Sequence, residues 1–391
     1  MEKLHLAALQ MVPGIGNARM KILVDYFGSA KKAWHSESSE LLGRKILPKK
    51  TVSEFVSYRN KINIDKIAEE WAKKNIKLLS IYDEKYPELL RHIKNPPYVL
   101  FYKGSYFDFN KTIAIVGSRK ASEYGRKATK LLASQLAEAG VCVVSGAARG
   151  IDTASHEGDL KTGVTIAVLG CGVDVTYPPE NKKLLDAIAE RGAVISEYPP
   201  GTPPFASNFP IRNRIISGLS RGVVVVEAGQ RSGSLITADF ALESGRDVFA
   251  IPGNIFSQIS QGTNNLIKMG AKLIDNVEGI LEEYNWERPT LENKEKDFYN
   301  KNLHNEYNCD NNEEEKVSFK EQKKIIEEKP DLNDEEEIVY NILSKNPVSM
   351  EEIVSRTGLP LGKISYILLQ LTIRGIAEEL SDRSYIRNSR G

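Results

Sequence analysis

Two arginines stand close together in the stretch FPIRNRIISG, which reads as a short helix that begins at Pro210. On that reading Arg212 and Arg214 fall in the first turn. A helix N-terminus already carries about half a positive charge, so each exposed cation there costs about 0.3 to 1 kcal/mol. The pair therefore predicts an anion nearby. The anion is either a carboxylate of the protein, Glu197 or Glu227, or a phosphate brought by a ligand.

Three other segments place small residues, serine or arginine in loops between strand-like and helical runs. These segments are Gly117-Ser118-Arg119, the run Ser145–Gly150 with Gly146 and Arg149, and Ser232-Gly233-Ser234. Small residues beside a helix start leave backbone N–H groups and hydroxyls open to a phosphate, and arginine adds a planar set of donors. In any one loop, glycine could serve only to turn the chain. Taken together, the segments predict an edge that binds phosphate.

The common nucleotide motifs are missing from this edge. A dinucleotide fold would carry GxGxxG after its first strand, but GCGVDV has Val175 at the third glycine position. GRKAT lacks the spacing of a phosphate-binding ATPase loop. NAD and ATP are therefore disfavoured as ligands, and no cofactor is expected.

Several acidic residues and one histidine keep an enzymatic reading open, although the sequence holds neither a Ser-His-Asp order nor HExxH. We expect His156 on a helix surface rather than as a catalytic base. Asp152 is more simply a helix cap, Asp174 a loop carboxylate, and Glu227 an ion-pair partner for the arginines. We therefore predict no catalytic residues.

These loops must be positioned by a parallel sheet. Six short runs rich in β-branched residues alternate with helical patterns: 112–117, 141–146, 165–170, 193–198, 222–228 and 247–253. Strands that are apolar on both faces and separated by helices indicate a doubly wound, Rossmann-like α/β fold. Ligands of such sheets bind beyond the carboxyl ends of the strands, where most of these runs end in glycine.

The regions on either side of this core, residues 75–284, lack its alternation of strand-like and helical segments. Residues 1–70 read as short helices, and Pro13-Gly14-Ile15-Gly16 is typical of a helix-hairpin-helix turn. Residues 285–332 are polar and charged, which predicts a flexible linker. Residues 333–391 give three helical patterns and a hairpin, the arrangement of a winged helix that binds either DNA or a protein. Its candidate cations are Lys363, Arg374, Arg383, Arg387 and Arg390.

The length and composition of the chain limit the number of domains and the kinds of ligand and location that are expected. The 391 residues suffice for two or three domains, and 53 lysines and arginines against 52 acidic residues restrict any nucleic-acid surface to a local patch. The three cysteines lie far apart without a CxxC, which argues against zinc and disulfides and fits a reducing cytoplasm. No segment approaches 18 apolar residues, so we expect no membrane span.

The ordered motifs IAIVGSRKASEYG, SGAARGIDTASHEGDL, TIAVLGCGVDVTYPPEN, FPIRNRIISGLSRGVVVVEAGQRSGSLITADFALESGRDVFAIPG and GTNNLIKMGAKLI resemble the DprA/Smf family of DNA-processing proteins. The resemblance implies a homodimer that binds and protects single-stranded DNA during natural transformation. It also implies that the protein helps the RecA recombinase to displace single-strand-binding protein, and that it is not an enzyme.

By motif position, the resemblance assigns the strand's phosphates to Ser118, Arg119, Arg212, Asn213, Arg214 and Ser232-Gly233-Ser234. Tyr177, Phe205 and Phe209 are candidates for stacking on bases, at about 1 to 3 kcal/mol per base, although core packing is an equal alternative for Phe209.

Two other functions remain open at this point. The first is an enzyme like the phosphoribohydrolases that act on nucleoside monophosphates, but their PGGxGTxxE motif is replaced by EAGQRSGSL. The second is a nucleotide sensor whose winged helix regulates transcription.

Overall fold

The computed structural model describes residues 1–105, 109–288, 332, 334–344, 348–374, 376–380 and 384–387. The chain divides into two units, Met1–Asn308 and Cys309–Gly391. The predicted linker therefore lies almost wholly outside the described residues. None of the described helices has the length and apolar character needed to cross a membrane.

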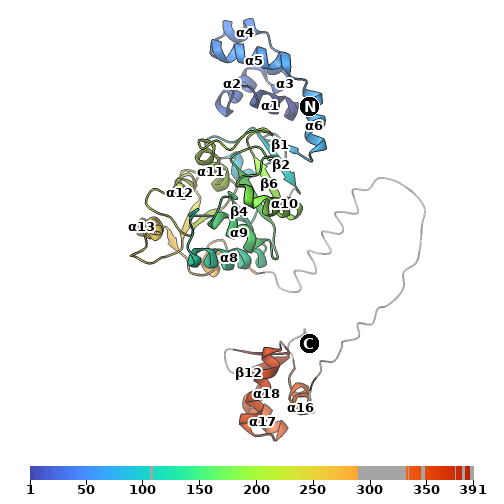
Figure 1. Ribbon diagram of the computed structural model, residues 1–391, viewed down its shortest axis with the longest axis vertical. Helices are drawn as coiled ribbons and strands as arrows, with labels where there is room; N and C mark the ends of the chain where they lie inside the picture. Colours follow the sequence, from blue (N-terminus) through green and yellow to red (C-terminus); the bar gives the residue numbers. More distant parts are fainter. Residues whose placement is uncertain are drawn as a thin grey trace, which may run out of the picture. The chain divides into compact units, whose positions relative to one another are not determined.

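The first unit is built on a nine-stranded sheet in the order β1-β2-β6-β5-β4-β3-β7-β8-β9. Figure 1 labels β1, β2, β4 and β6 of this sheet. Its strands are β1 (Lys77–Ser80), β2 (Val99–Gly104), β3 (Thr112–Val116), β4 (Cys142–Ser145), β5 (Thr165–Leu169), β6 (Ala193–Ser196), β7 (Gly222–Val225), β8 (Asp247–Ala250) and β9 (Lys272–Leu273). The six predicted strands are confirmed as β3 to β8, and they pair in parallel.

The sequence analysis did not predict three strands of this sheet, β1, β2 and β9. β2 pairs antiparallel with both β1 and β6, and β9 extends the other edge in parallel. β9 is only two residues long, and β1 has no run of β-branched residues, so neither carries the pattern of a buried parallel strand.

Helices cover both faces of the sheet, as the doubly wound reading predicts. One face packs on α7 (Glu88–Arg91), α11 (Asn208–Gly218) and α12 (Gly233–Glu243); the other packs on α8 (Glu123–Glu138), α9 (Ile151–Asp159), α10 (Lys182–Arg191) and α14 (Glu278–Leu281). α13 (Gln261–Lys268) precedes β9. The strands alternate between these two cores: Ala114 and Val116 of β3 enter the first, whereas Ile113 and Ile115 enter the second.

Six helices precede the sheet: α1 (Glu2–Gln10), α2 (Asn17–Phe27), α3 (Ala30–His35), α4 (Ser38–Gly43), α5 (Lys49–Lys61) and α6 (Ile64–Lys73). Their apolar core continues onto β2 through Val99 and Phe101, so they pack against the sheet. The predicted hairpin turn joins α1 to α2, with Gly14 at φ 85°. Arg19 donates to the Gly14 carbonyl and therefore braces the turn.

The second unit is a winged helix. It contains α16 (Asp334–Ile342), β10 (Val348–Ser349), α17 (Met350–Thr357), α18 (Leu361–Ile373), β11 (Ala377–Glu379) and β12 (Ser384–Arg387). The predicted helices and hairpin are present, and β10 adds a third strand in the order β10-β12-β11.

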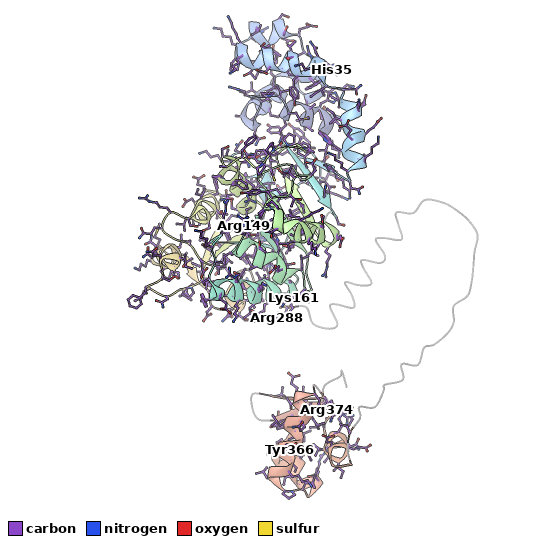
Figure 2. All side chains as sticks on the ribbon, viewed as in Figure 1. His35, Arg149, Lys161, Arg288, Tyr366 and Arg374 are labelled. Carbon is purple, nitrogen blue, oxygen red and sulfur yellow. The ribbon has the colours of Figure 1, made fainter. Side chains whose placement is uncertain are left out.

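Two cations of the winged helix have partners within their own unit. Arg374, labelled in Figure 2, pairs with Glu336 at 3.1 Å, and the Arg387 guanidinium lies 4.2 Å from the centre of the Tyr340 ring. Arg383 and Arg390 lie outside the described residues. The exposed side of α18 presents Tyr366 and Leu369.

Candidate functional site

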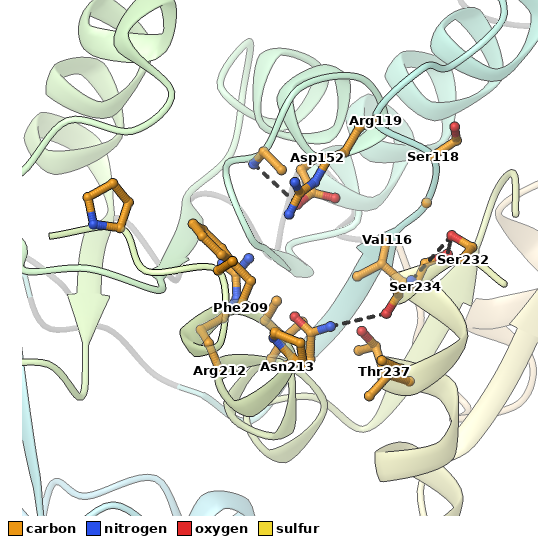
Figure 3. Close-up of a pocket in the computed structure, with 18 of the residues that line it drawn as sticks. Val116, Ser118, Arg119, Asp152, Phe209, Arg212, Asn213, Ser232, Ser234 and Thr237 are labelled. Carbon is orange, nitrogen blue, oxygen red and sulfur yellow. Dashed lines mark hydrogen bonds between the residues drawn. The ribbon is translucent and has the colours of Figure 1, made fainter.

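A cleft of about 430 Å³ lies at the carboxyl ends of β3, β4 and β7 (Figure 3). β3 is the point where the strand order reverses, because the chain runs from β3 to β4 on one side and returns to β7 on the other. Ligands of doubly wound sheets bind at such a switch point. The cleft therefore occupies the position that the fold itself predicts.

Most of the predicted site residues meet in this cleft. Those that line it are Gly117, Ser118, Arg119, Tyr177, Phe209, Arg212, Asn213, Ser232, Gly233 and Ser234. Those that do not are Gly146, Arg149, Phe205 and Arg214. The cleft also contains Ala148, Asp152 and Thr237, which the sequence analysis did not assign to a ligand.

Arg119 extends over the cleft from the loop after β3 and is exposed (Figure 3). Its guanidinium carbon lies 5.3 Å from the centre of the Phe209 ring. Within the described part of the chain it has neither a hydrogen bond nor a carboxylate within 4 Å. Its charge does lower the pKa of Asp152, but only as a minor contribution. The guanidinium donors of Arg119 are therefore available to a ligand.

Arg212 is only 3% exposed and is committed to the protein. Its Nη1 donates to the carbonyl of Gly146 at 2.7 Å and to that of Val168. α11 begins at Asn208, so Arg212 lies in the second turn, and the expected repulsion at the first turn does not arise. Burial lowers the pKa of Arg212, while the charge of Asp152 opposes that shift. Arg212 thus holds the ends of two strands and shows only part of its surface to the cleft.

Arg214 points away from the cleft and has an internal partner. Its Nη2 lies 2.6 Å from Oε1 of Glu197, and both side chains are about 10% exposed or less. The same Glu197 oxygen accepts a hydrogen bond from Asn17 of α2 at 2.6 Å. Of the two anions considered for this helix, a protein carboxylate is therefore correct for Arg214.

Glu227 is not a partner of the arginines, contrary to our expectation. Its carboxylate accepts from the backbone N–H of Ser122 at 2.9 Å and from the Ser122 hydroxyl, at the start of α8. A Cβ atom on Gly125 would lie 2.4 Å from this carboxylate. The glycine at that position therefore makes room for Glu227 rather than for a ligand.

The glycines after β4 also act by close packing. A Cβ atom on Gly146 would lie 2.6 Å from both the Arg212 Nη2 and the Asp152 Oδ2 atoms, so any larger residue would have to displace these side chains. Gly150 has a φ of 80°, and a Cβ atom added to it would lie 2.3 Å from the carbonyl oxygen of Ser118. The absence of a side chain therefore lets the two loops approach each other here. Arg149 lies on the surface, where it pairs with Glu180 (Figure 2).

The start of α12 opens into the cleft. Ser232 caps the helix, and its hydroxyl lies 2.7 Å from the Ser234 hydroxyl. Asn213 of α11 donates to the Gly233 carbonyl at 3.2 Å and joins the two helices. No acidic residue occurs in the first turn of this eleven-residue helix. The positive end of its dipole is therefore not neutralised from within, which favours an anion.

Aromatic rings form one wall. Tyr177 and Phe209 lie with their ring centres 5.4 Å apart, and the Phe209 ring also faces the guanidinium groups of Arg119 and Arg212. Phe205 is 57% exposed and lies outside the cleft lining.

Asp152 is the carboxylate of the cleft. It is not a side-chain cap, because Gly150 occupies the cap position of α9; it accepts instead from the Ala148 N–H at 3.2 Å. Burial raises the pKa of Asp152, and the charge of Arg212 opposes the shift. Asp174 is a loop carboxylate as expected, and it pairs with Lys74 at 3.0 Å.

His156 is buried rather than on a helix surface. Its Nδ1 atom lies 2.7 Å from the Thr165 hydroxyl, and burial lowers the pKa of His156 to about 3. Three polar residues of α9 besides Asp152 face the sheet, so the helix pattern alone misjudged this side chain. Among the described residues, no group of three His, Cys, Asp or Glu side chains is arranged to hold a metal.

Known proteins resemble this chain over most of its length. Residues 77–285 match the family model of DNA recombination-mediator protein A, and residues 327–383 match the DprA winged helix domain. Protein Smf of Synechocystis is 34% identical over 394 residues, which cover 99% of each chain. DNA processing protein DprA of Streptococcus pneumoniae is 50% identical over 208 residues, covering 52% of this chain and 73% of that protein.

A solved structure resembles this chain as well. The X-ray structure of DNA processing protein A from Streptococcus pneumoniae superposes with a TM-score of 0.64 at 38% identity, covering 72% of this chain and 97% of that chain. Because a family model matches more than half of the chain and a relative matches nearly all of it, the chain belongs to the DprA/Smf family of DNA-processing proteins.

Proposed function

We propose that this protein binds single-stranded DNA in the cleft and acts as a recombination mediator without breaking the strand. The observation that carries the proposal is the pairing of two unneutralised positive features, the Arg119 guanidinium and the start of α12. A sugar-phosphate chain presents the anions that both features favour.

In this assignment one phosphate lies between Arg119, the first N–H groups of α12 and Asn213. The Tyr177 and Phe209 wall then offers a surface for an adjacent base. Phosphate contacts position a strand but carry no information about its sequence, so strands of any sequence should bind. Arg212 contributes indirectly, because it fixes Gly146 and Val168 beneath the cleft.

The chemistry of the cleft supports binding rather than bond breaking. Among the described residues that line it, Asp152 is the one acidic side chain, and no histidine is present. Asp152 is held by the Ala148 N–H and lies in the field of Arg212. This carboxylate therefore already balances a charge of the protein, which is a poor starting point for a general base.

The mediator role rests on the family. We propose that the protein, as a homodimer, protects the strand and assists RecA in displacing single-strand-binding protein. The test is a strand-exchange assay on oligonucleotides that are precoated with single-strand-binding protein. Addition of this protein should shorten the lag before RecA filaments grow, and an unchanged lag would refute the mediator role.

Binding is tested separately by fluorescence anisotropy with a labelled 20-mer and its duplex. The single strand should bind more tightly, and its affinity should fall steeply with salt because bound phosphates release counterions. Equal affinity for strand and duplex would contradict the proposal. Release of free base from nucleoside monophosphates would instead favour the phosphoribohydrolase alternative.

A further inference from the structure

A second cavity, of about 390 Å³, lies beside the phosphate cleft at the same edge of the sheet. It is lined by Ser122, Tyr124, Glu227, Pro252, Gly253, Asn254, Ser257 and Ser260. The two cavities adjoin where the N–H of Ser118, which lines the cleft, donates to the carbonyl of Glu227, which lines the second cavity, at 2.7 Å. The second cavity is therefore near enough to be reached by a strand that is held in the cleft.

The charge of the second cavity is opposite to that of the first. Its buried carboxylate, Glu227, is 3% exposed and sits at the start of α8, where Ser122 supplies two donors, one to each oxygen. These bonds hold the group in place, and an ionised carboxylate has further lone pairs that can accept from a ligand. The same negative charge repels a phosphate. This cavity suits a neutral group with N–H donors.

The rim of the second cavity carries an oriented aromatic ring. Tyr124 is 54% exposed, and its hydroxyl donates to the Pro252 carbonyl at 3.0 Å. That bond fixes the hydroxyl end of the ring while its surface stays open to solvent. Asn254 uses its side-chain oxygen to accept from the Phe256 N–H at 2.9 Å, and its amide N–H₂ has no partner among the described residues. Such a combination can bind a nucleobase, because an aromatic face stacks on the base and the amide and carboxylate groups hydrogen-bond its edge.

We propose that this second cavity takes a nucleobase of the bound strand, with the base stacked on Tyr124 and its exocyclic amino group donating to Glu227. The inference rests on the proposed binding of single-stranded DNA. Cytosine presents an amino donor to the carboxylate, whereas thymine presents a carbonyl oxygen at the same position. The site therefore adds a modest preference for amino-bearing bases to a contact that otherwise accepts every sequence.

The test compares dC12 and dT12 by competition anisotropy. The wild-type protein should bind dC12 at least about fivefold more tightly, and Glu227→Gln should bring the ratio close to one. Glu123→Gln is the matched control, because Glu123 is an exposed acid in the first turn of α8, close to the Ser122 that Glu227 contacts, and pairs with Lys127. It should keep the wild-type ratio. Equal binding of both strands by the wild type would overturn the proposal.

Two further measurements keep the test decisive if Glu227→Gln weakens the start of α8. An oligonucleotide of N4,N4-dimethylcytosine lacks the donor, so the wild-type protein should bind it no better than dT12. Tyr124→Ala should weaken both strands, whereas Tyr124→Phe should weaken them much less, because it keeps the ring and loses only the hydrogen bond to Pro252. Unchanged preference for the dimethylated strand over dT12 would overturn the role of Glu227.

Failure of the proposed function would look different. Arg119→Ala should weaken dC12 and dT12 equally and preserve their ratio. If it leaves both affinities unchanged, the phosphate cleft is wrongly assigned, whatever the ratio shows.

Discussion

Replacing Arg119 with alanine removes the cation of the cleft that no other described residue neutralises. Arg149→Ala is its matched control, because Arg149 is also an exposed arginine in a loop at the carboxyl edge but pairs with Glu180 and does not line the cleft. Both side chains are on the surface, so each change should alter the free energy of unfolding by no more than about 0.5 kcal/mol. The pair therefore separates a local contact from a general loss of positive charge.

The magnitude follows from the contact that is lost. A hydrogen bond to a charged group contributes about 1.5 to 3 kcal/mol, which corresponds to roughly a 10- to 150-fold loss of affinity. The cation–π contact with Phe209 is present with or without DNA, so it cancels to first order. One phosphate contact fewer should also reduce the slope of log affinity against log salt by about 0.7 for a single strand. Arg149→Ala should change affinity by less than about twofold, since its charge is already paired.

The assay is fluorescence anisotropy of a labelled dT20 at four salt concentrations between about 50 and 200 mM. Affinity changes steeply with salt in this range, so the slope can be measured there. Thermal melting of each variant first establishes that both are folded. Two results would refute the reasoning: an Arg119→Ala protein that binds like the wild type at every salt concentration, or an Arg149→Ala protein that loses as much affinity as Arg119→Ala.

Three further predictions concern stability. Glu197→Gln removes the buried partner of an arginine and should cost about 3 to 5 kcal/mol in urea unfolding, against at most about 1 for Glu180→Gln at the exposed pair; equal losses would show that the buried pair is not the cause. Gly146→Ala overpacks the floor of the cleft and should lower the free energy of unfolding by about 1 to 3 kcal/mol. Gly233→Ala should lower it less in melting experiments, because its new Cβ atom meets nothing within 4 Å. The reverse order would contradict the packing argument. Burial raises the pKa of Asp159 from 3.8 to about 8, so between these values the folded protein binds a proton that the unfolded chain releases. Stability should therefore fall as the pH rises from about 6.5 to 8, by up to about 1.4 kcal/mol per pH unit. Asp159→Asn should abolish the fall, and a fall that persists in that variant would assign it to another group.

The parallel core was predictable because its strands are buried on both faces and therefore form continuous apolar runs in the sequence. The loops that follow them were predictable for the same reason, since the end of each run fixes which residues reach the carboxyl edge. Gly117, Arg119 and Ser232 were placed in the cleft by this argument. β2 lacked such a signal, because its second half, Tyr102 to Gly104, is only partly buried.

The destinations of individual charges were not predictable from one helix or strand at a time. Arg212 and Arg214 differ by two positions, yet one faces two carbonyl groups and the other faces Glu197. Which of them is neutralised depends on Glu197, which only the tertiary fold brings beside Arg214. The same limit explains His156: the face of α9 that meets the sheet contains polar side chains, so polarity wrongly indicated solvent.

The N-terminal helices contact the core not only through apolar packing but also through one residue, Glu197. Asn17 donates to the Glu197 side chain and Gln10 to its backbone carbonyl, while Arg214 approaches the same carboxylate from α11. A shortened chain that starts at the sheet would therefore do more than lose an appendage. It would uncover Val99 and Phe101 and admit water to the ion pair of Arg214, which lies on α11 between the cleft residues Asn213 and Ile216. Helices and sheet are in this sense a single folding unit, and minimal versions of the protein are better cut after the core than before it.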